Sequence, residues 1–170
     1  MSSILNLPQQ PQKNIIPQQT ILTTLVLEAA QSDKTLRDAL INNPGKVLID
    51  AGFALRDQDV AGFNQYCQND AGISALLAHL AAGGEIEQLT GWKCIVCKSV
   101  VYPIAIALVA VGAGAVATLT VASPAVLALA AFAGVAAATA LAFIVSITTA
   151  IAGGVSVVAS EICSWTGACS

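Results

Sequence analysis

Short runs of apolar residues at helical spacing fill residues 20–84. Thr20 can cap a first helix, and Ser32-Asp33 can cap a second one. Asn43 should end the second helix, because the residue before a proline is pushed away from the helical region. Pro44 then suits the first turn of a third, short helix.

Gly52 is a typical stop for this third helix. Two more amphipathic stretches follow, at residues 60–66 and 73–80. Together these elements predict a small all-α unit. Residues 1–19 are rich in proline and glutamine and have no period, so the sequence predicts a disordered tail there.

A long apolar block follows, in which no residue from Ser99 to Ser160 is charged. A bilayer-spanning helix needs about 20 apolar residues, and Ser99–Ala122 and Ala125–Ile147 are both long enough. We therefore expect a hydrophobic helical hairpin with an added half-length helix. The alternative is a compact, saposin-like bundle of short helices that opens on a membrane. Three aromatic residues near the ends of the block are candidates for the membrane interface: Trp92, Tyr102 and Trp165.

Composition and charge narrow the function. Apolar residues make up 56% of the chain and charged residues 10%, against about 25% charged in an average globular domain. A net charge of −3 without a basic cluster argues against nucleic acid as a partner. No nucleophile with a base, phosphate loop or cofactor motif is recognisable, and the sole histidine, His79, sits in an Ala/Leu helix. We expect no enzyme and no cofactor.

The dipeptide Gly83-Gly84 separates the polar front half from the apolar block. Two consecutive glycines weaken a helix by about 1 kcal/mol each relative to alanine, so the link should be flexible. It is either an interdomain hinge or a protease site. The expected organisation is a tail (1–19), a helical leader (20–84) and a hydrophobic core peptide (85–170).

Four of the five cysteines bracket the apolar block: Cys94, Cys97, Cys163 and Cys169. Pairing the front couple with the back couple would close the block by disulfides, although four cysteines allow three pairings. A zinc site and thioether crosslinks to dehydrated Ser or Thr are the other chemistries left open. The remaining cysteine, Cys67, stands alone in the front half.

Residues 30–52 resemble the nitrile-hydratase-like leader peptide family, whose members precede ribosomally made, modified peptides. Ala30, Asp33, Arg37, Leu40 and Pro44 match its pattern, while Leu36, Ile41 and Asn43 stand where the family has Phe, Leu and Asp. Many such leaders end in a double glycine that is cut by a peptidase-containing ABC exporter. The resemblance implies cleavage after Gly84 and a set of residues that bind the processing machinery: Asp33, Leu36, Arg37, Leu40, Ile41, Pro44 and Gly52.

The cysteine-bracketed layout of residues 85–170 is similar to that of the small archaeal halocins and their bacterial relatives. The resulting hypothesis is a bacteriocin-type precursor, made in the cytoplasm, whose secreted core inserts into target membranes, alone or as a self-oligomer. The alternative is an uncleaved integral membrane protein, an adaptor or immunity factor, with a cytoplasmic helical domain.

Overall fold

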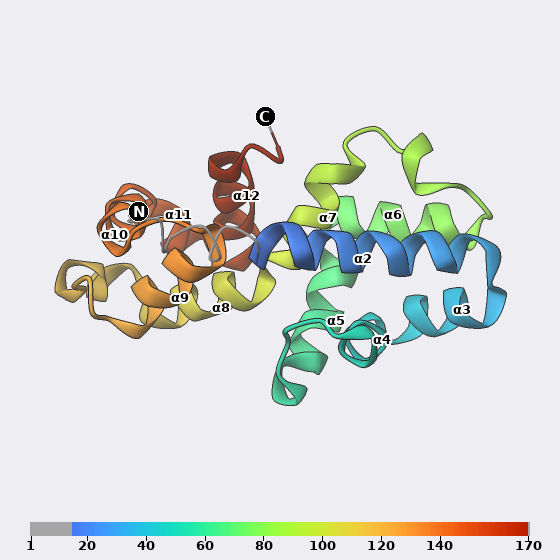
Figure 1. The fold of residues 1–170 in the computed structure, drawn as a ribbon, viewed down its shortest axis with the longest axis horizontal. Coiled ribbons are helices and arrows are strands. Elements are labelled where there is room, and N and C mark those ends of the chain that lie inside the picture. The colour runs from blue at the N-terminus through green and yellow to red at the C-terminus, as the bar shows by residue number, and fades with distance from the viewer. Residues whose placement is uncertain (1–14, 170) are drawn as a thin grey trace, which may run out of the picture. The chain divides into compact units, whose positions relative to one another are not determined.

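The computed structural model describes residues 15–169, with side chains from 18 onward. The described residues are about 80% helical and contain no strand (Figure 1), which confirms the all-α prediction. Contacts divide the chain into two compact units. Among the described residues, we call 19–100 with 168–169 the N-terminal unit, and 101–167 with 15–18 the C-terminal unit.

Local signals place most helices of the N-terminal unit. Their bounds are α2 Ile15–Ser32, α3 Lys34–Asn42, α4 Pro44–Ala51, η3 Asp57–Asp59, α5 Val60–Asn69, α6 Ala71–Ala81, η4 Ile86–Gln88 and α7 Trp92–Val100. Asp33 caps α3 by accepting from the backbone N–H of Leu36 at 3.1 Å, and Asn43 caps α4 in the same way. Gly52 ends α4 in the left-handed conformation. These starts and stops are as predicted.

The start of the first helix differs from the prediction. α2 begins at Ile15 rather than after Thr20, so residues 15–19 are helical and not a disordered tail. Proline is tolerated in the first turn of a helix, where its missing N–H has no intrahelical partner, and Pro17 lies in that turn. The rest of the predicted tail lies outside the described residues.

The core of the N-terminal unit is assembled from all of its longer helices. Its most deeply buried side chains include Phe63, Leu80, Ile86 and Val96. α7 packs against α6 and contributes Val96 and Ser99 to the wall of a small apolar cavity. The unit therefore extends sixteen residues past Gly84.

The C-terminal unit is a bundle of short helices. Their bounds are α8 Tyr102–Val111, η5 Ala113–Thr118, α9 Pro124–Ala133, α10 Ala137–Ser146, α11 Thr148–Gly153 and α12 Val155–Thr166. α8 packs on α9 and α12, and α9 packs on α10. Buried Leu108, Leu129, Ile144 and Ile162 fill its centre.

The two expected uninterrupted spans do not form. Within the described residues no single helix combines the length and apolarity needed to cross a bilayer, and only two bent pairs, α7 with α8 and α9 with α10, meet both criteria together. The second pair bends by 106°, because Gly134 takes a left-handed conformation with φ of 74° that ends α9. The bundle alternative describes this unit better than the hairpin.

Candidate processing site

The glycine pair ends α6 in a defined turn. The N–H of Gly83 donates to the carbonyl of Leu80, and the N–H of Gly84 donates to the carbonyl of His79, both at 2.9 Å. These two bonds are those of a Schellman motif, whose first residue beyond the helix takes a positive φ. Gly83 has φ of +85° and is exposed. The link is thus an ordered helix stop.

The side chain of His79 lies beside Gly84, the second glycine of the pair. A Cβ atom on Gly84 would come too close to the imidazole ring of His79 in its present position, so the ring would have to turn aside. The Nε2 atom of the same ring lies 2.8 Å from the carbonyl oxygen of Glu85, so an Nε2–H donates to it. The backbone conformation therefore favours glycine at position 83, whereas a side chain at position 84 would only have to displace the His79 ring. The role of His79 escaped sequence reasoning, although its place five residues before Gly84 was visible.

The residue after the turn is anchored to α2. The N–H of Ile86 donates to Oε1 of Gln31 at 2.6 Å, and the Ile86 side chain is fully buried. Glu85, by contrast, is exposed. A protease would meet a short accessible stretch, Gly83 to Glu85, held between α6 and this anchor.

Several of the predicted leader-recognition residues serve the fold. Arg37 donates from Nη1 to the carbonyl of Gln31 at 3.2 Å and so pairs with the C-terminal end of α2. Leu40 is only 2% exposed, and Pro44 is buried. Leu36 and Ile41 are half-buried, which leaves part of each side chain accessible to a partner.

Asn64 also supports this segment, a role that no sequence pattern predicted. Its side-chain Nδ2 donates to Oδ1 of Asn43, while its Oδ1 accepts from the N–H of Gly45, both at 2.8 Å. The start of α4 is thereby tied to α5. The segment that resembles the leader family is a rigid part of the unit.

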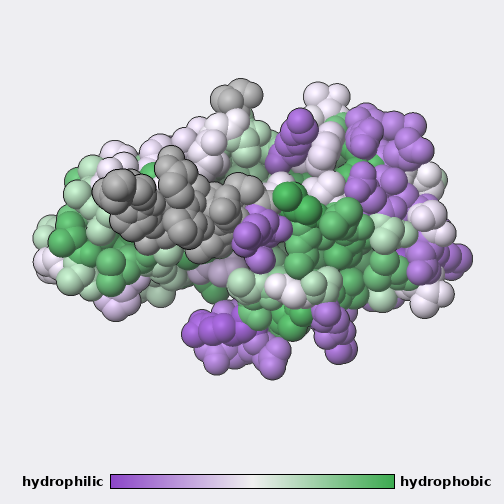
Figure 2. Space-filling view, in the orientation of Figure 1, coloured by the Kyte–Doolittle hydropathy of each residue, from purple (hydrophilic) through white to green (hydrophobic). Residues whose placement is uncertain are grey.

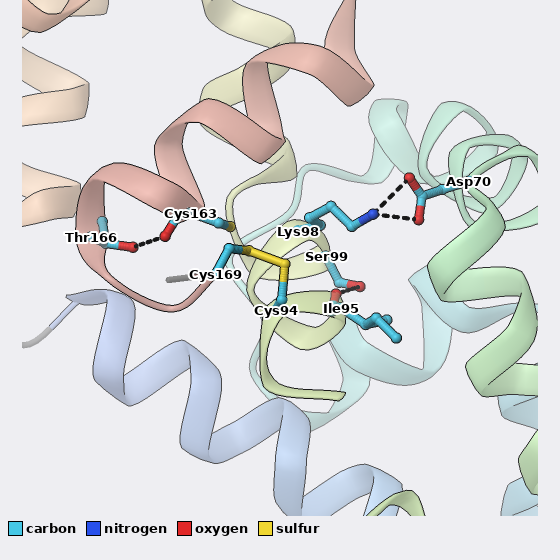
Figure 3. The surroundings of a disulfide bond; sticks show 8 residues. All are labelled: Asp70, Cys94, Ile95, Lys98, Ser99, Cys163, Thr166 and Cys169. Carbon is cyan, nitrogen blue, oxygen red and sulfur yellow. Dashed lines mark hydrogen bonds and ion pairs between the residues drawn. A yellow bond between two sulfur atoms is a disulfide. The ribbon is translucent and has the colours of Figure 1, made fainter. Parts of the chain in front are cut away.

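A disulfide joins the front cysteine couple to the back one (Figure 3). It links Cys94 and Cys169, whose Cα atoms are 4.7 Å apart and whose positions differ by 75 residues. Cys97 and Cys163 each also take part in disulfide bonding. No group of three or more His, Cys, Asp or Glu side chains among residues 15–169 could hold a metal ion.

Cys67 is the one free cysteine among the described residues, and it is buried. Burial, with a smaller contribution from the charge of Asp70, raises the pKa of its thiol to about 12. A thiol is reactive as the thiolate, so Cys67 is inert in the folded unit.

Lys98 and Asp70 form a part-buried ion pair between α7 and the start of α6 (Figure 3). Lys98 Nζ lies 3.1 Å from Oδ2 and 3.2 Å from Oδ1 of Asp70. Asp70 also caps α6 by accepting from the N–H of Ile73 at 3.0 Å. Sequence reasoning missed this pair, because its members lie 28 residues apart and neither belongs to a motif.

The three aromatic residues expected at a membrane interface differ in their burial and in their neighbours. Tyr102 is buried. Trp165 stacks on Phe143 with ring centroids 4.1 Å apart. Trp92 is half-buried, with Lys93 Nζ 5.8 Å from its ring centroid. Their role at a membrane stays a prediction.

No protein-family model, curated protein or solved structure matches this chain.

Proposed function

We propose that this chain is the precursor of a secreted, membrane-active peptide of bacteriocin type. The leader binds the processing enzymes and an exporter with a peptidase domain. Cleavage after Gly84 yields residues 85–170, which insert into target membranes.

The surface of the C-terminal unit carries this proposal. Between residues 101 and 167 the only charged side chain is Glu161. Helices α8 and α9 consist of apolar residues on every face, apart from the Tyr102 hydroxyl. Large apolar side chains are exposed at Val121, Leu127 and Val145. Figure 2 shows the strongly hydrophilic residues over the N-terminal unit, which also has a green, hydrophobic patch, and pale to green colours over the C-terminal one.

Helices that are apolar all round favour an apolar environment on every side. Moving such surface out of water stabilises by about 25 cal/mol per Å². The helices are short, however: the ten residues of α8 give about 15 Å of helix, half of a bilayer core of about 30 Å. The proposed insertion therefore begins with the short helices spreading at the interface, as in the bundle alternative.

One observation favours the second candidate, an uncleaved membrane protein with a helical domain. The N-terminal unit continues through Gly83-Gly84 to Val100 without a break in packing, and the pair forms the turn that ends α6. Under this reading the glycine pair is a helix stop only.

The intact mass of the chain-derived species in a producing culture separates the two candidates. The precursor reading predicts a secreted 85–170 product, lighter by about 2 Da for each disulfide. A thioether crosslink would instead appear as a loss of about 18 Da for each dehydrated Ser or Thr. Intact chain confined to the membrane fraction would contradict the precursor reading.

A further inference from the structure

The first helix of the proposed product belongs to the fold of the leader. α7 lies in the N-terminal unit, where Ile95, Val96 and Val100 are buried. Val96 and Ser99 line the same apolar cavity as leader residues Leu40, Phe63 and Leu76. Removing α7 would open the leader's own core to water.

Polar contacts hold the same segment. The N–H of Ile86 is bound by Gln31 of α2. The ammonium of Lys98 is bound by both oxygens of Asp70, a carboxylate that is 4% exposed. A buried charge that loses its partner is strongly destabilised, so Asp70 favours the arrangement in which α7 stays in place.

A disulfide also links the C-terminal end of the product to α7. Cys94 belongs to α7, and its bond to Cys169 attaches residues 168–169 to the N-terminal unit. None of these contacts involves the peptide bond between Gly84 and Glu85. A cut there leaves all of them intact.

We propose that the leader binds the product non-covalently after cleavage, through a surface on α2 and α6 that takes residues 86–100, and that the Asp70–Lys98 pair sets the strength of this retention. The proposal rests on the cleavage proposed above. Under this proposal the leader is a carrier that releases the product only when α7 dissociates from it.

The test uses the full oxidised chain with a site-specific protease sequence inserted between Gly84 and Glu85. After complete cutting, shown on a denaturing gel, light scattering coupled to size exclusion at micromolar concentration measures whether the two pieces travel together. We expect one species containing both. Two separate pieces from the wild-type sequence would overturn the proposal.

Variants then test the ion pair. Asp70→Asn keeps an oxygen to cap α6 but removes the charge, and Lys98→Met removes the other partner. Each should raise the dissociation constant of the cut pair by about tenfold or more, with circular dichroism before cutting showing that helix content is kept. The matched control is Asp38→Ala, which breaks the exposed Lys34–Asp38 pair of 2.8 Å and should leave retention unchanged. Equal loosening by Asp38→Ala would refute the assignment to Asp70.

Because the cut is engineered, this result does not depend on natural processing or membrane activity. Dye release from vesicles is measured on the same samples. Retained pieces that permeabilise vesicles as fast as separated ones would overturn the carrier role. Vesicles that stay sealed with every sample, including fully separated product, would instead overturn the membrane-active function and leave the measured retention standing.

Discussion

At the residue scale, Gly84 and His79 show how a short motif can have two explanations. The dipeptide is typical of exporter-cleaved leaders, yet the ring of His79 occupies the space where a Cβ on Gly84 would lie. The glycine pair is visible in the sequence, but the position of the His79 ring beside it could not be predicted. That position depends on how the helix ends. Tests of cleavage at this site must therefore separate steric effects from recognition by the protease.

A double-mutant cycle makes that separation. Gly84→Ala should lower the free energy of unfolding only slightly, because the His79 ring can turn away from the new methyl group, and it should block processing. In a His79→Ala background no ring has to move, so Gly84→Ala should leave the free energy of unfolding unchanged, while processing stays blocked. Chemical denaturation and the mass of the secreted product measure the two effects.

The control for the cycle is His79→Ala alone, which loses the contact to the Glu85 carbonyl but keeps both glycines. It should still be processed. If the double variant were processed like this control, glycine at position 84 would be needed for space only, and recognition of the pair by a peptidase would be wrong.

At the element scale, the sequence predicted the helices that are set by neighbouring residues. The Asp33 cap, the break before Pro44 and the stop at Gly52 are local, so α3 and α4 were placed correctly. The uninterrupted apolar run of residues 99–122 predicted one helix, whereas Gly112 ends α8. Hydropathy could not show this break, because it carries no information on backbone conformation. The Asp70–Lys98 pair depends on tertiary packing and could not be read from spacing.

The α3 helix offers a test of the leader resemblance. Leu40→Ala removes a buried side chain and should destabilise the unit by about 3 kcal/mol, whatever its role in recognition. Leu36 is half-buried, so Leu36→Asp should reduce processing with a much smaller loss of stability. Thermal unfolding and the fraction of cleaved product distinguish the two roles.

The exposed face of α3 supplies a control. Thr35→Asp introduces the same charge one residue away, at an exposed position, and should leave processing intact. Processing that survives Leu36→Asp would contradict recognition through this face. Processing lost equally in Thr35→Asp would mean that charge, and not the apolar side chain, is what the machinery senses.

At the scale of the whole molecule, the boundary between polar and apolar sequence differs from the boundary between the two folded units. The polar and apolar halves meet at Gly84, but the compact units meet between Val100 and Val101. The difference arises because α7 carries one lysine that pairs with the leader and apolar residues that fill the leader's core. The predicted hydrophobic half thus contains one α-helix, α7, that belongs to the N-terminal unit.

The central claim is that the C-terminal bundle, whose one charged side chain is Glu161, prefers lipid to water. Its most direct test is the release of dye from sealed vesicles by oxidised product 85–170, separated from the leader, together with co-sedimentation of the product. Leu127→Lys, at an exposed apolar position of α9, should weaken both, because it replaces an apolar side chain that would leave water with a charged one that stays hydrated. Ser164→Lys, at an exposed position in the last turn of α12, is the matched control. We predict leakage and co-sedimentation for the unchanged product and the control; a product that stays a soluble monomer and leaves the vesicles sealed would contradict the account.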